Sequence, residues 1–126
     1  MAVAVDGDPK TIQEIARVAL DREQVEIPRD AWDKMQASRQ IIEDIISENN
    51  RVYGINTGFG KFADVAISIE NIRKLQTNLV LSHAVGVGEP FSEPEVRAAM
   101  FLRANALAKG MSGIRPEVVE TICSLL

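Results

Sequence analysis

This chain carries the stretch Tyr53-Gly54-Ile55-Asn56-Thr57-Gly58-Phe59-Gly60. Three glycines beside one tyrosine allow backbone conformations that other residues rarely adopt. They bring a phenol and the polar pair Asn56 and Thr57 to one place, as loops that carry a site commonly do. Packing alone gives no reason for such a run of glycines. The stretch therefore predicts a functional loop.

A second informative stretch is Ser82-His83-Ala84-Val85-Gly86-Val87-Gly88-Glu89-Pro90. Together the two stretches resemble the aromatic amino acid ammonia-lyase family, and its histidine ammonia-lyase members most of all. These enzymes remove ammonia from an L-amino acid and leave an unsaturated acid. The resemblance continues through Val96-Arg97, residues 103–110 and residues 112–115, and it covers most of the chain after residue 50.

The resemblance implies a role for each part of the two stretches. Tyr53 is expected to be the catalytic base, and Ser82 and His83 are expected to bind the substrate near its side chain. Asn56 either contacts the substrate or holds the loop, because an asparagine side chain readily bonds nearby backbone. The residues expected to shape the loop are Gly54, Thr57, Gly58 and Gly60.

Two simpler interpretations compete with these roles. An isolated tyrosine is more often a packing residue, and a lone histidine on an apolar helix face is more often a hydrogen-bonded core residue. The complete glycine loop favours a catalytic Tyr53, and the Ser82-His83 pair favours a substrate with a polar ring. Tyrosine ammonia-lyases and tyrosine aminomutases can also carry histidine here. The family is therefore better determined by the sequence than the substrate.

A prosthetic group also follows from the resemblance. Family members form an electrophilic methylidene-imidazolone (MIO) ring from an internal Ala-Ser-Gly triplet that lies beyond the Ser-Gly-Ile-Arg region. No Ala-Ser-Gly occurs in this chain. We therefore expect an N-terminal portion of a lyase that is inactive alone, with no cofactor of its own and MIO in the full-length parent. The apolar residues Leu125 and Leu126, which no cap follows, favour the same expectation.

Periodicity and caps predict a mainly α fold. Capping boxes at Thr11 to Glu14 and Ser92 to Glu95 mark two helix starts, and Gly110 marks a helix end. The lone His83 closes an apolar stripe and is expected to end a buried face. The expected helices cover residues 12–20, 30–48, 69–83, 93–109 and 116–126, and Ser68 is the expected cap of the third. The expected extended segments cover 24–27 and 51–53.

The resemblance places these elements in the N-terminal part of an aspartase/fumarase-like helical lyase, with short β segments around the glycine loop. We expect one N-terminal domain over residues 1–126. The family is homotetrameric, and its sites combine residues from several subunits. A homo-oligomer, most simply a tetramer, and a small amino acid substrate are therefore the expected partners.

Composition excludes several other classes of protein. The net charge of −4 comes without a run of lysine or arginine, which disfavours nucleic acid as a partner. No apolar run is long enough to span a membrane, and one histidine with one cysteine cannot form a metal cage. The glycine loop lacks the residue order of a phosphate-binding motif.

A cytoplasmic location fits the single Cys123. The competing hypothesis is a non-catalytic helical module that binds partner helices.

Overall fold

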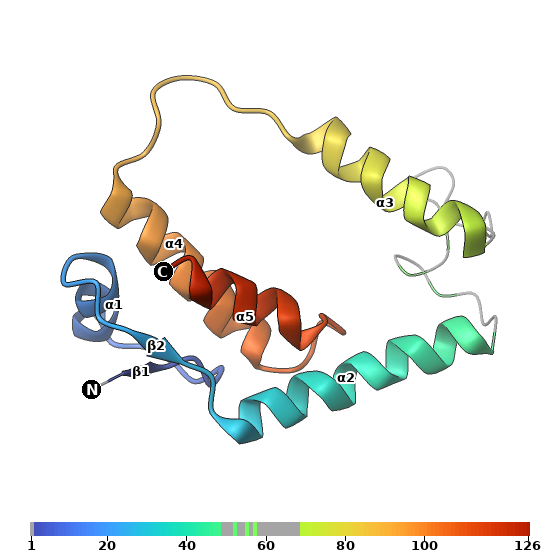
Figure 1. The fold of residues 1–126 in the computed structure, drawn as a ribbon, viewed down its shortest axis with the longest axis horizontal. Helices are drawn as coiled ribbons and strands as arrows, with labels where there is room; N and C mark the ends of the chain where they lie inside the picture. Colours follow the sequence, from blue (N-terminus) through green and yellow to red (C-terminus); the bar gives the residue numbers. More distant parts are fainter. Residues whose placement is uncertain (1, 49–51, 53–54, 56, 58–68) are drawn as a thin grey trace. The chain divides into compact units, whose positions relative to one another are not determined.

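The computed structural model describes residues 2–48, 52, 55, 57 and 69–126 (Figure 1). The chain divides into two compact units, one formed by residues 1–41 with 90–126 and the other by residues 42–89. The prediction of a single domain stays a prediction. The described parts of both units are mainly helical, so the mainly α fold expected from the sequence is confirmed.

The first unit is a helical cluster closed by a small sheet. Helix α4 (Glu93–Ala108) packs against α1 (Ile12–Ala19) and α5 (Pro116–Ser124), and α5 turns back along α4 (Figure 1). The first part of α2 (Arg29–Ser47) belongs to the same unit. Apolar side chains from several segments meet in its core. The fully buried members include Val5, Val18, Met35, Phe101 and Val119.

A two-stranded parallel sheet joins the start of this unit to the segment after α1. Strand β1 (Val3–Ala4) pairs with β2 (Val25–Glu26), with Val3 opposite Val25. The backbone N–H of Val3 donates to Gln24 O at 2.8 Å, and that of Val5 donates to Glu26 O at 2.8 Å. The short strand expected at 24–27 is thus confirmed. Its partner β1 carries no sequence signal of its own, because two residues are too few to show a period.

The predicted helix ends follow from local chemistry. Thr11 caps α1 in a capping box with Glu14, and Glu95 accepts hydrogen bonds from both the backbone N–H and the hydroxyl of Ser92 at the start of α4. Gly110 has a φ of +70°, and a Cβ there would lie 2.6 Å from the carbonyl carbon of Lys34. Only glycine fits this position without a shift of the neighbouring backbone.

The second unit contains the end of α2 and helix α3 (Ile69–His83). The expected stripe on α3 is only partly covered, since Leu75 and Leu79 are half-buried. The prediction that His83 ends a buried face is wrong, because the His83 side chain is exposed. Every residue from 80 to 93 is exposed, which includes the last turn of α3. The expected cap of this helix, Ser68, lies outside the described residues.

Candidate active site

The glycine loop is described at Ile55 and Thr57, and the preceding Val52 is also described. The backbone N–H of Ile55 donates to Val52 O at 3.2 Å. Thr57 forms an isolated β-bridge and is only 2% exposed. This burial suits the loop-holding role expected of Thr57. The other expected members lie outside the described residues, and they are Tyr53, Gly54, Asn56, Gly58 and Gly60.

Ser82 and His83 form a hydrogen-bonded group at the end of α3. The Ser82 hydroxyl donates to Leu79 O at 2.9 Å and lies 3.0 Å from Nδ1 of His83. The same Nδ1 lies 2.9 Å from Leu79 O. The imidazole is thus bound to its own helix through one nitrogen. Both side chains are exposed, so they are accessible to a substrate.

Two other residues that follow the family pattern are structural in this chain. Arg97, which is 8% exposed, donates from Nε and Nη2 to Val18 O at 3.1 and 2.9 Å, and from Nη1 to Leu126 O. Asn105 accepts hydrogen bonds from the backbone N–H groups of Asp6 and Gly7 at 3.2 and 3.1 Å. Its Nδ2 donates to Asp8 O at 2.8 Å. Both residues therefore join α4 to other segments of the first unit.

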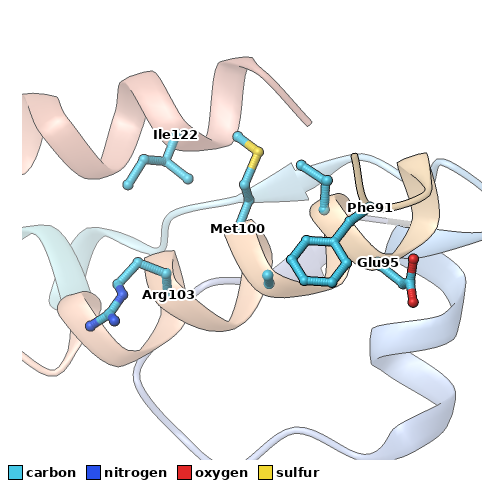
Figure 2. Close-up of a pocket in the computed structure, with 7 residues that line it drawn as sticks. Phe91, Glu95, Met100, Arg103 and Ile122 are labelled. Carbon is cyan, nitrogen blue, oxygen red and sulfur yellow. The ribbon is translucent and has the colours of Figure 1, made fainter. Parts of the chain in front are cut away.

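An apolar groove lies between α4 and α5 in the first unit. Figure 2 shows Met100 of α4 and Ile122 of α5 pointing into it, with the Phe91 ring near one end and the Arg103 guanidinium at the other. Its remaining lining residues are Glu95, Val96 and Ala99. None of the expected site residues lines this groove. It leaves apolar side chains of α4 uncovered, among them the exposed Val96.

The remaining reactive groups of the described chain do not form a second centre. Burial raises the pKa of the Cys123 thiol, and the nearby Glu120 carboxylate adds to this shift. Such a thiol is a poor nucleophile. In the described part, no cluster of histidine, cysteine and carboxylate side chains could hold a metal ion. No helix there is long and apolar enough to cross a membrane.

A family model for aromatic amino acid lyases matches residues 10–126, which include both candidate stretches. The chain belongs to the aromatic amino acid lyase family. It is 48% identical over 124 residues to the histidine ammonia-lyase of Caldanaerobacter subterraneus subsp. tengcongensis and 46% identical over 124 residues to that of Bacillus subtilis. Each match covers 98% of this lyase chain and 24% of the relative. The chain thus spans about a quarter of the length of these relatives.

Solved structures of the lyase family share the fold of this chain. Tyrosine aminomutase from Streptomyces globisporus matches with a TM-score of 0.90 and 40% identity over 98% of this chain and 24% of its own. Histidine ammonia-lyase from Trypanosoma cruzi matches with a TM-score of 0.88 and 35% identity over 98% of this chain and 23% of its own. The expected helical lyase fold is thereby confirmed.

Proposed function

We propose that this chain is the N-terminal portion of a histidine ammonia-lyase-like enzyme, which eliminates ammonia from L-histidine to give urocanate. The observation that carries the proposal is the 48% identity to a histidine ammonia-lyase over 98% of the chain. The Ser82-His83 pair supports histidine as the substrate, because an imidazole can exchange one donor and one acceptor with another polar ring.

Within this proposal Tyr53 is the catalytic base and removes the weakly acidic proton next to the ring-bearing carbon. A phenol with an ordinary pKa of about 10 is a weak base at neutral pH. The rest of the enzyme therefore has to favour the deprotonated form of Tyr53. Asn56 contacts the substrate or holds the loop, and the buried Thr57 fixes the loop backbone. His83 binds the substrate ring.

The activation of the amine has to come from outside this chain. The MIO ring supplies an electrophile for the amine when it is present, but its Ala-Ser-Gly source does not occur among the 126 residues. We propose that the longer enzyme provides the ring and is a cytoplasmic homotetramer. The exposed apolar side chains of α4, among them Val96 and Leu102, support further covering by protein in the complete enzyme.

The test compares this chain with the full-length protein that carries it. Each is incubated with L-histidine, and the ultraviolet absorbance of urocanate is followed. We expect turnover by the full-length protein and none by the 126-residue chain. Turnover by the purified chain above a mock preparation, or an inactive but folded full-length protein, would contradict the proposal.

A second candidate function is the conversion of tyrosine, by elimination or by an aminomutase reaction. The observation that favours it is the TM-score of 0.90 and 40% identity to a tyrosine aminomutase. Product analysis with L-tyrosine separates the alternatives, since elimination yields an unsaturated acid and an aminomutase yields a β-amino acid. A helical interaction module without catalysis is the remaining alternative, and it predicts no turnover of either amino acid by the full-length protein.

A further inference from the structure

The hydrogen bonds around His83 decide which ring nitrogen carries the proton. Nδ1 lies 2.9 Å from Leu79 O, and a carbonyl oxygen can only accept a hydrogen bond. If Nδ1 were unprotonated, two lone pairs would face each other at that distance. Nδ1 is therefore the donor, and in the neutral ring Nε2 must be the acceptor.

The Ser82 hydroxyl supports the same arrangement. It donates its one proton to Leu79 O at 2.9 Å, which leaves its lone pairs facing Nδ1 at 3.0 Å. If the hydroxyl proton pointed at Nδ1 instead, Leu79 O would face lone pairs on both side chains. A single assignment of protons thus satisfies all three short distances, and in it Ser82 is a second acceptor for the Nδ1 proton.

We propose that Ser82 and the Leu79 carbonyl fix neutral His83 in the tautomer protonated on Nδ1, so that Nε2 accepts a hydrogen bond from the ring of the amino acid substrate. Ser82 is then a positioning residue rather than a substrate ligand. The part that concerns the substrate rests on the proposed function. In this arrangement a ring N–H or O–H of the substrate donates to Nε2, and phenylalanine lacks such a donor.

The tautomer can be measured directly because His83 is the only histidine of the chain. In the 126-residue chain labelled with ¹⁵N, long-range proton-nitrogen correlation distinguishes a protonated from a bare ring nitrogen. The spectrum is recorded at about pH 9, where an ordinary imidazole is neutral. The same chain unfolded in urea gives the reference ratio of tautomers. We expect Nδ1 to be protonated in the major folded species, and a major species protonated on Nε2 would overturn the proposal.

Three serine variants test the part played by Ser82. Ser82→Ala should shift the tautomer ratio toward the unfolded reference, and Ser82→Thr, which keeps a hydroxyl, should restore the folded ratio. The matched control is Ser124→Ala, since Ser124 is also exposed near a helix end and its hydroxyl donates to Thr121 O at 2.8 Å. This control should leave the ring signals unchanged. An unchanged ratio in folded Ser82→Ala would remove Ser82 from the positioning role.

The consequence for the substrate is measured in the full-length protein. Ser82→Ala should lower the ratio of kcat/KM for histidine to that for phenylalanine by roughly two- to tenfold, the worth of one net hydrogen bond. Ser82→Thr should restore the ratio. An unchanged ratio alongside a shifted tautomer would overturn the assigned contact of Nε2. The tautomer measurement requires no turnover. The tautomer proposal and the proposed lyase function can therefore be contradicted separately.

Discussion

Gly110 shows how a single residue fixes the packing of the first unit. It ends α4 with a φ of +70°, in the left-handed region that favours glycine. The space for a side chain is already filled, since a Cβ would lie 2.7 Å from Lys34 O. The end of α4 and the first part of α2 can therefore meet only when residue 110 lacks a side chain.

Gly110→Ala should lower the free energy of unfolding by about 1–3 kcal/mol, because the variant must adopt an unfavourable φ and also displace the backbone near Lys34. Urea denaturation measures the change. The control is Gly86→Ala, since a Cβ at Gly86 would meet nothing within 4 Å. Equal midpoints for Gly110→Ala and Gly86→Ala would show that the close approach to Lys34 does not contribute to stability.

At the scale of elements, Arg97 joins α4 to α1. Its guanidinium binds the carbonyl oxygen of Val18 through two nitrogens near the end of α1, where the helix leaves carbonyl groups without partners. Arg97→Met should cost about 1–3 kcal/mol of unfolding free energy, because it leaves the buried Val18 carbonyl unsatisfied. Arg103→Met, at an exposed arginine of the same helix, should be close to neutral. Similar denaturation midpoints for the two variants would contradict this account.

The capping boxes predict how the helices respond to acid. The hydrogen bond from the backbone N–H of Thr11, and next the one from its hydroxyl, hold the pKa of Glu14 below its ordinary value of 4.5. The hydrogen bond from the Ser92 hydroxyl, and next the one from its backbone N–H, likewise lower the pKa of Glu95. The folded pKa values are thus lower than the unfolded ones. This stabilisation is present above pH 4.5 and is lost as the pH falls through the folded pKa values.

A variant with both Glu14→Gln and Glu95→Gln should be less stable at neutral pH and should lose less stability on acidification. Denaturation followed by circular dichroism at pH values on either side of 4.5 measures both effects. Glu117→Gln, in the first turn of α5, is the control for a charge lost near a helix start. Acid sensitivity equal to that of the unmodified chain would exclude the two caps as its source.

Over the whole molecule, features that depend on neighbouring residues were predicted better than contacts between distant segments. The caps at Thr11 and Ser92 and the stop at Gly110 depend on residues within one helical turn, and all three were correctly predicted. Strand β1 was missed because its only signal is pairing with β2 across the whole of α1. The exposure of His83 was predicted wrongly, since periodicity identifies an apolar stripe but not which chain segment covers it.

The candidate site shows the same limit. The family could be recognised from the glycine loop and the Ser82-His83 pair, because each is a continuous run of residues. The hydrogen bonds of Asn105 to residues 6–8 could not be predicted in detail, because they join segments nearly 100 residues apart in sequence. The residues that form the electrophile could not be assigned from this chain either, since the Ala-Ser-Gly triplet does not occur in it.

The central claim is that this chain supplies the catalytic base of an ammonia-lyase. The most direct test is turnover of L-histidine by the full-length protein and by its Tyr53→Phe variant, with circular dichroism to confirm that both are folded. Only the ionisable oxygen is removed, so we expect turnover to fall by about 10²- to 10⁴-fold, as for loss of a positioned base. Near-normal turnover by folded Tyr53→Phe protein would contradict the account.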